Sequence, residues 1–240
     1  MSFDDALRLA QEKGYAEKDP TADVEGHDAC RKICILASLG FGRHVYPEQV
    51  KTEGITGITA TDVEYADSLG YVIKLIGRAQ KLESGKICAS VRPTLVSREN
   101  ILSDVSGVFN AIMVNGDETG DVMFYGRGAG KAPTASAVVA DVIDCAKHLT
   151  ARKYLFWEDG SPDYVTEADL KVRLYVYAKS SDYDSLIESS AVAFPDLDGI
   201  IKNSRSGEIA FITDEGLESQ LRERISSIKA DSIKVMHTLS

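Results

Sequence analysis

Acidic side chains gather in a short stretch near the start of the chain, and a lysine follows them. The carboxylates are those of Glu17, Asp19, Asp23, Glu25 and Asp28. Carboxylates so close together repel one another unless a cation lies among them. That cation can be the ammonium group of Lys32, the ammonium group of a substrate, or a metal ion. The stretch is therefore a candidate site for chemistry on a small molecule.

A shaped loop and a helix are expected to position these groups. Pro20 favours extended or turn geometry for Asp19, within a loop that glycines bracket. From about Asp28, apolar residues recur at steps of three and four, at Cys30, Ile33, Cys34 and Ala37. This spacing predicts a helix with one buried face, which ends near Gly40 and Gly42.

Asp28 and Lys32 lie one turn apart on this predicted helix. A carboxylate in the first turn interacts favourably with the helix dipole and can hold an ammonium group one turn later. When exposed, such a pair contributes only about 0.2 to 0.5 kcal/mol, which does not explain the other acids. From spacing alone, a solvated salt bridge beside an acidic loop is the commoner explanation.

The composition is that of an ordinary globular protein of 240 residues, 44% of them hydrophobic. The net charge of -10 argues against nucleic-acid and membrane partners, because both surfaces are anionic and would repel the chain. No run approaches the roughly 18 apolar residues of a membrane span, and the first residues do not resemble a signal peptide. We therefore expect a cytoplasmic protein that acts on a small molecule.

Cysteines and histidines predict neither a metal centre nor a catalytic triad. The four histidines are scattered, so neither a zinc site nor a Ser/His/Asp order can be read from them. We expect no metal site. The cysteines form no CxxC pair, and we expect buried free thiols at Cys30, Cys34, Cys88 and Cys145.

Hydrophobic patterning beyond the first helix predicts a mostly antiparallel sheet. The run Thr61-Asp62-Val63-Glu64 has the form of a capping box that opens a helix ended by Gly70. Strands are expected over residues 72–82 and 86–96, and a hairpin over residues 107–114 and 121–125. A helix over residues 133–149 is expected to cover one face of the sheet.

A second unit is expected after a boundary at about Trp157 to Thr166, where Gly160-Ser161-Pro162 is typical of a linker. Its strands and helices are predicted in the order βαββαβ, the ferredoxin-like arrangement. The expected ranges are 172–178, 181–193, 199–202, 208–213, 217–228 and 232–238.

A glycine-rich run, Gly126-Arg127-Gly128-Ala129-Gly130, leaves the backbone accessible just before a predicted helix. The edge of a phosphate or cofactor can approach such a backbone. The run is not a dinucleotide fingerprint, because that needs a parallel strand before it and an acidic residue about 20 positions after it. As a bare pattern, such a run is more often a tight turn.

The stretch from Gly14 to Lys32 resembles the catalytic signature of homoserine dehydrogenases. The matching positions are Gly14, Tyr15, Ala16, Glu17, Asp19, Pro20, Asp23, Gly26, Asp28 and Lys32. Further stretches resemble family landmarks in family order, namely Glu53-Gly54-Ile55, residues 70–75, Arg92-Pro93, Phe109-Asn110-Ala111, residues 124–130 and residues 133–136. The resemblance is close over about residues 3–149. Residues 171–240 are similar only in pattern to an ACT-like extension.

This resemblance implies an α+β fold, in which a mostly antiparallel or mixed sheet is covered by helices and followed by an ACT-type domain. We expect a substrate-binding, catalytic and dimerisation domain over residues 1–155, a linker over 156–168, and an ACT-like regulatory domain over 169–240. The family places its nucleotide-binding domain ahead of the signature, so we expect a fragment without that domain. A homodimer or higher oligomer is also implied.

The family interconverts L-homoserine and L-aspartate 4-semialdehyde with NAD or NADP, in threonine, methionine and isoleucine biosynthesis. The resemblance implies that Lys32 is the general acid and base of this oxidoreductase. It implies that Asp28 orients Lys32 and contacts the substrate. The implied substrate contacts are Glu17 and Asp23 for the ammonium group and Tyr15 for a hydroxyl contact. The implied cofactor contacts are the backbones of Gly14, Gly128 and Gly130.

The ACT-like extension leaves two functions open. ACT modules commonly bind amino acids, and threonine is the natural feedback signal of the pathway, but Ser180 to Asp184 departs from the usual glycine-containing ligand loop. A structural or dimerising domain is an equally good interpretation. The whole chain could also be a non-catalytic module that senses an amino acid or assembles with a partner. The retained carboxylates and Lys32 favour the enzyme.

Overall fold

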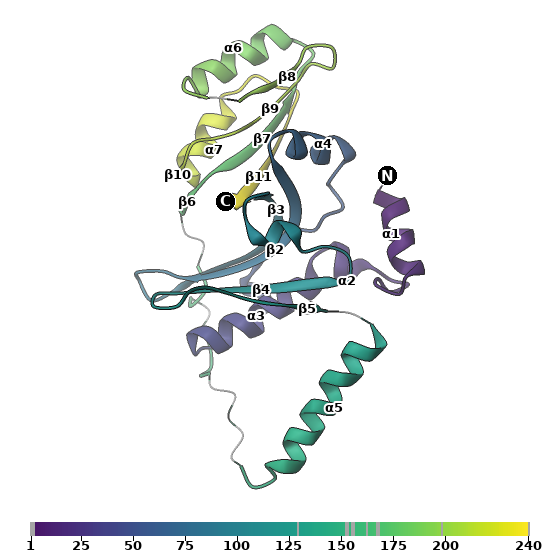
Figure 1. Cartoon of the computed structure of the whole chain (residues 1–240). Helices are drawn as coiled ribbons and strands as arrows, with labels where there is room; N and C mark the ends of the chain where they lie inside the picture. Colours follow the sequence, from purple (N-terminus) through teal and green to yellow (C-terminus); the bar gives the residue numbers. More distant parts are fainter. Residues whose placement is uncertain are drawn as a thin grey trace.

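A mixed seven-stranded sheet runs through the molecule in the computed structural model (Figure 1). The structure describes residues 3–128, 130–151, 154, 157–161, 163–166, 169–197 and 199–239. Across the sheet the order is β1 (Lys51–Thr52), β3 (Ile87–Ser97), β11 (Ser232–Leu239), β7 (Leu174–Lys179), β9 (Glu208–Ile212) and β8 (Ile201–Asn203). The strand β2 (Tyr71–Lys81) lies outside this order and pairs with β3 along its whole length.

The pair β3 and β11 joins the last strand of the chain to the first unit in this sheet. These strands run parallel, with His237 opposite Thr94 and Leu239 opposite Val96. The antiparallel pairs are β2 with β3, β11 with β7, β7 with β9, and β8 with β9. The expectation of a mixed sheet covered by helices is confirmed, and the sheet continues across the boundary predicted from the sequence.

The helix after the acidic loop, α3 (His27–Phe41), forms where the apolar spacing predicts it. Cys30, Cys34 and Ala37 are buried in a core shared with β3. Burial is the main cause that raises the pKa of the Cys34 thiol, to about 12. The helix ends at Gly42, which has a φ of 77° that favours glycine.

The helix α4 (Ala60–Ser68) begins two residues before the predicted position. Thr59 caps it, because the Thr59 hydroxyl accepts from the Asp62 amide at 3.2 Å while Asp62 accepts from the Thr59 amide at 2.7 Å. The predicted capping box at Thr61 is therefore wrong. Asp62 belongs to a capping box, but as the third helical residue, which follows its cap.

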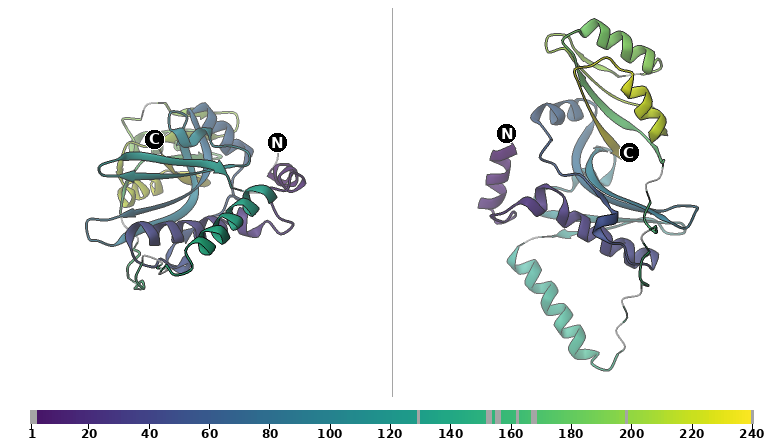
Figure 2. Two further views of the ribbon diagram at one scale, coloured as in Figure 1. Left: turned by 60° about the horizontal axis from the view of Figure 1, so that its bottom comes forward. Right: turned by 180° about the vertical axis from the view of Figure 1, so that it is seen from behind.

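The hairpin of β4 (Phe109–Gly116) and β5 (Gly120–Arg127) forms a separate two-stranded sheet. The helix α5 (Lys131–Lys147) follows it, and no described residue of α5 is buried. Figures 1 and 2 show α5 projecting away from the sheet. The prediction that this helix covers a sheet face is wrong, and so is that of a buried Cys145. Helical spacing defines an apolar face but not what lies against it.

The stretch predicted as a linker packs partly onto the first unit. Tyr164 is buried in the core beneath α3, and the amide of Ile87 donates to the Tyr164 carbonyl at 3.0 Å. The His44 amide likewise donates to the Glu158 carbonyl at 2.8 Å. The expectation of a boundary without a core element is therefore wrong around Tyr164. Glycine and proline indicated a loop here, but not where the loop packs.

The C-terminal unit, residues 169–239, contains the six predicted strands and helices in order, together with two short strands, β6 and β10, that were not predicted. Its elements are β6 (Lys171–Val172), β7, α6 (Tyr183–Ala193), β8, β9, β10 (Gly216–Leu217), α7 (Glu218–Ser226) and β11. The helices α6 and α7 contribute Leu186, Leu221 and Ile225 to a core on one face of the strands. Tyr65 and Ala66 of α4 pack with Tyr175 in a separate core. This unit is thus anchored to the first.

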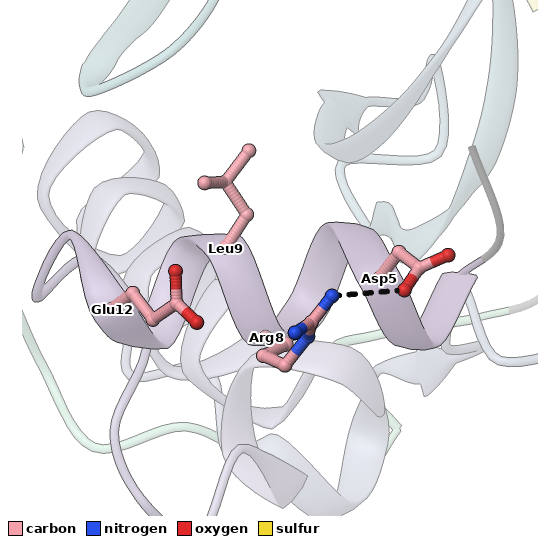
Figure 3. Close-up of a pocket in the computed structure, with 4 residues that line it drawn as sticks. All are labelled: Asp5, Arg8, Leu9 and Glu12. Carbon is pink, nitrogen blue, oxygen red and sulfur yellow. Dashed lines mark hydrogen bonds and ion pairs between the residues drawn. The ribbon is translucent and has the colours of Figure 1, made fainter.

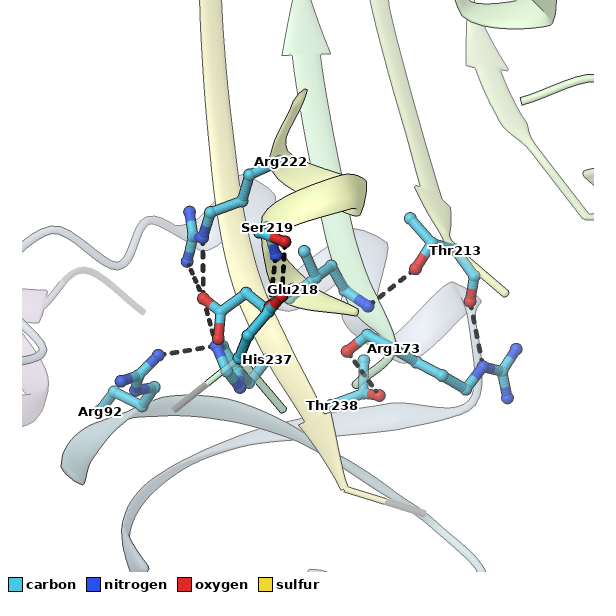
Figure 4. A network of polar contacts seen from close by, with 10 residues as sticks. Arg92, Arg173, Thr213, Glu218, Ser219, Arg222, His237 and Thr238 are labelled. Carbon is cyan, nitrogen blue, oxygen red and sulfur yellow. Dashed lines mark hydrogen bonds and ion pairs between the residues drawn. The ribbon is translucent and has the colours of Figure 1, made fainter. Parts of the chain in front are cut away.

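A polar network lies where α7 meets the pair β3 and β11 (Figure 4). The His237 ring nitrogen Nε2 is 3.1 Å from Glu218 and 2.6 Å from the Arg92 guanidinium. Arg222 holds the same Glu218 carboxylate at 2.7 Å. The network therefore links β3 of the first unit to the C-terminal unit. No helix among the described residues is long and apolar enough to cross a membrane.

Candidate functional site

The structure brings Asp28 and Lys32 together on the outer face of α3. The Lys32 ammonium nitrogen lies 2.6 Å from an Asp28 carboxylate oxygen, across one helical turn. Their side chains are 43% and 62% exposed, respectively. The pair is therefore accessible to a small molecule, and the carboxylate restricts where the ammonium group lies.

The acidic loop ahead of α3 is ordered by its own hydrogen bonds. Asp19 accepts from the Thr21 hydroxyl at 2.6 Å and from the Thr21 amide at 3.1 Å. These two bonds lower the pKa of Asp19. The short helix α2 (Thr21–Val24) follows directly. The side chain of Gln11 donates to the Glu17 carbonyl at 2.9 Å, which ties the start of the loop to α1 (Phe3–Glu12).

Of the predicted substrate contacts, Tyr15 and Glu17 lie on the surface of this loop and Asp23 on the surface of α2. All three side chains are exposed, and Tyr15 is 45% exposed. The described part of the chain holds no group of three or more His, Cys, Asp and Glu side chains placed to bind a metal ion.

A second loop, which contains Gly54, packs against the signature stretch at Val24 and Glu25. A Cβ atom on Gly54 would lie 2.5 Å from the Val24 carbonyl oxygen and 2.7 Å from the Glu25 Cα, so no side chain fits there. Gly26, which precedes α3, has a φ of 77° and faces Thr52 and Val91. Sequence reasoning gave Gly54 no role. A glycine within Glu53-Gly54-Ile55 was the available signal for a close backbone approach.

The glycines predicted to admit a cofactor differ in the space around them. Gly14 has a φ of 71° and open space where a side chain would be. Gly130 has a φ of 113° and faces only Pro133. At Gly128 the Asn110 side chain already fills the position of a Cβ. Both Figure 1 and Figure 2 place the start of α5 on the side of the molecule where α2 and the start of α3 lie.

A hollow on α1 was not predicted from the sequence. Asp5, Arg8, Leu9 and Glu12 line it, and Arg8 pairs with Asp5 at 3.2 Å (Figure 3). All four side chains come from one exposed helix, and three of them are charged. Exposed ion pairs of this kind contribute little free energy, so we do not assign this hollow a catalytic or binding role.

Comparison with known proteins places the signature in a family. Residues 1–143 match the homoserine dehydrogenase family. The homoserine dehydrogenase of Synechocystis sp. is 52% identical over 153 residues, which cover 62% of this chain and 35% of the relative. That of Pseudomonas aeruginosa is 50% identical over 150 residues, covering 62% of this chain and 34% of the relative. The chain thus spans about a third of the curated relatives that it matches.

Solved structures cover more of the chain. The crystal structure of a homoserine dehydrogenase from Thiobacillus denitrificans aligns with a TM-score of 0.80 at 32% identity, over 100% of this chain and 59% of that chain. A homoserine dehydrogenase from S. aureus aligns with a TM-score of 0.78 at 36% identity, over 100% of this chain and 60% of that chain. The arrangement of both units therefore has counterparts in solved structures.

Proposed function

This chain belongs to the homoserine dehydrogenase family, and we propose that it carries the surface on which L-homoserine and L-aspartate 4-semialdehyde are interconverted with NAD or NADP. The observation that carries the proposal is the 2.6 Å pair of Lys32 and Asp28 on an exposed helix face, directly after the acidic loop. A charged proton donor held by a carboxylate, beside groups that attract an ammonium ion, suits reduction of an amino aldehyde.

In this proposal Lys32 donates a proton to the reacting oxygen, or accepts one from it. In the reductive direction, the Lys32 ammonium group would donate a proton to the aldehyde oxygen as negative charge develops there. In the oxidative direction the neutral amine accepts the hydroxyl proton. Asp28 keeps the Lys32 nitrogen on the substrate side of α3 throughout.

The acidic loop binds the other end of the substrate. Glu17 and Asp23 attract the ammonium group, and Tyr15 offers its hydroxyl. Binding of that cation would reduce the repulsion between the carboxylates of the loop. Orientation of the substrate between loop and helix then places the reacting carbon near Lys32.

The nicotinamide cofactor supplies or accepts the hydride when bound. The open space at Gly14 and Gly130 fits a close approach of a cofactor edge to the backbone, whereas Asn110 limits the approach at Gly128. We propose that the nucleotide-binding domain, which the family places ahead of the signature, binds most of the nucleotide.

The C-terminal unit is proposed as an ACT-type domain, because β7, α6, β8, β9, α7 and β11 follow the βαββαβ order, with the short strands β6 and β10 added. Threonine is its proposed ligand, and calorimetry with threonine tests this, since no heat at millimolar ligand would favour a purely structural role. A homodimer is proposed through the hairpin. Its exposed apolar pairs, Ile112 opposite Phe124 and Val114 opposite Val122, lie on one face.

Calorimetry with two ligands tests the substrate assignment. We expect the chain to bind L-homoserine more tightly than 4-hydroxybutanoate, which lacks the amino group. Glu17→Gln should remove about tenfold of that preference, because a charge-assisted hydrogen bond is lost. The control Glu118→Gln removes the same charge from the distant hairpin turn. An unchanged preference in Glu17→Gln would contradict the ammonium role.

A further inference from the structure

We propose that Lys234, on the last strand, is a positioning residue for the catalytic signature, and that it acts through the bridging loop, residues 53–59. The proposal rests on the proposed function, because it assigns a support to that substrate site. Lys234 lies far from the signature in sequence and belongs to the C-terminal unit. The bridging loop contacts both, at opposite ends.

Lys234 holds the far end of the bridging loop. Its ammonium nitrogen donates to the Gly57 carbonyl at 2.8 Å and pairs with an Asp62 carboxylate oxygen at 2.5 Å. The Asp62 side chain is only 2% exposed, and it also accepts from the Thr59 amide at 2.7 Å. Removal of the cation would leave the buried carboxylate without a compensating charge, which is strongly destabilising. Lys234 therefore fixes both the loop and the start of α4.

The near end of the bridging loop lies directly against the signature. The Ile55 amide donates to the Val24 carbonyl at 2.7 Å. Next to it, Gly54 approaches Val24 and Glu25 so closely that any side chain would overlap their backbone. Because Gly26 and α3 follow at once, the loop sets where the helix that carries Asp28 and Lys32 begins.

Hydrogen bonds along the bridging loop connect its two ends. The Ile58 amide donates to the Ile55 carbonyl at 3.0 Å, which closes a turn between Gly57 and the signature contact. The Glu53 amide donates to the Val91 carbonyl of β3 at 2.8 Å. The loop is therefore a short, fixed spacer. A shift of β11 relative to the first unit would displace it against the signature.

Four variants of the full chain test this coupling. The two readouts are L-homoserine affinity and hydrogen exchange of the Ile55 amide, each measured well below the melting temperature of the variant. Lys234→Met removes the far contact, and Gly54→Ala forces the near contact apart. We expect both to weaken L-homoserine binding by about fivefold or more and to speed hydrogen exchange of the Ile55 amide. The controls are Lys202→Met, on β8 of the same unit, and Gly40→Ala, where a Cβ would meet nothing within 4 Å. Both should behave as the unmodified chain.

Wild-type homoserine affinity in a folded Lys234→Met or Gly54→Ala variant would overturn the proposal. If Lys234→Met does not fold, Asp62→Asn with Lys234→Met removes the unpaired buried carboxylate and gives the same test. If the unmodified chain binds no homoserine, the proposed function fails instead. Hydrogen exchange still decides the coupling then, because an Ile55 amide that exchanges at the same rate in Lys234→Met would contradict it.

Discussion

Glu218 is the carboxylate at which α7 meets the junction of β3 and β11 (Figure 4). The hydrogen bond from His237 is the main cause that lowers the pKa of Glu218 to about 2, while burial opposes the shift and Arg222 adds to it. Its pKa in an unfolded chain is near the ordinary value of 4.5. The ionised form of this group therefore stabilises the fold.

Because of Glu218, the free energy of unfolding should depend on pH in the acid range. Because the folded pKa of Glu218 is depressed, its contribution is fully present above pH 4.5 and is lost as the pH falls toward 2. Chemical unfolding should show that Glu218→Gln lowers the free energy of unfolding by about 3 kcal/mol at pH 5.5. The difference from the unmodified chain should largely vanish near pH 2. An equal difference at both pH values would contradict this account.

The sequence predicts some side-chain pairs and not others. Asp28 and Lys32 are one helical turn apart, so their contact follows from spacing once the helix is recognised. Lys234 and Asp62 meet only because β11 lies beside α4 in the folded chain. Such a contact depends on the tertiary arrangement, which local patterns do not contain. The sequence therefore indicated the candidate site but not what supports it.

At the scale of elements, α4 begins at a different residue from the one expected from the sequence. Thr59 forms the capping box with Asp62, whereas Thr61 lies inside the helix. Thr59→Ala should lower the free energy of unfolding by about 1 kcal/mol, because it leaves a helix-end amide without its acceptor. Thr61→Ala is the matched control and should change it by less than about 0.5 kcal/mol. The reverse order in urea unfolding would restore Thr61 as the cap.

Element boundaries were predicted well where periodicity and turn residues agreed. The strands β2 and β3 start within a residue of their expected positions, and Gly42 ends α3. Packing partners were predicted poorly. The apolar face of α5, with Val138 and Val142, remains exposed in this chain. Its spacing is that of a covered helix, so the sequence indicates a face that needs a partner without naming it.

At the scale of the whole molecule, the two units share one sheet. The parallel pairing of β11 with β3 and the core between α4 and the C-terminal strands join them. A sequence-based division at residues 156–168 could not reveal this, because the last strand returns to the first unit from the far end of the chain. The units are expected to unfold together.

This continuity predicts coincident unfolding transitions. Leu186 is fully buried in the core of the C-terminal unit, and Leu186→Ala should cost about 2 to 5 kcal/mol. Trp157, the only tryptophan, packs on His44 and reports on the first unit. Tryptophan fluorescence and far-ultraviolet circular dichroism should therefore shift to the same lower melting temperature. A fluorescence transition that stays unchanged would show that the units unfold independently.

Hydride transfer measured in a chimera tests the central claim most directly. The chimera joins this chain to the preceding segment of the Pseudomonas aeruginosa relative, and the assay follows NADP reduction with L-homoserine. The account predicts turnover, and a loss of about 100-fold or more in kcat for Lys32→Met, because its general acid and base is removed. The neighbouring exposed Arg31→Met should retain activity. Near-normal kcat in the Lys32→Met chimera would contradict the account.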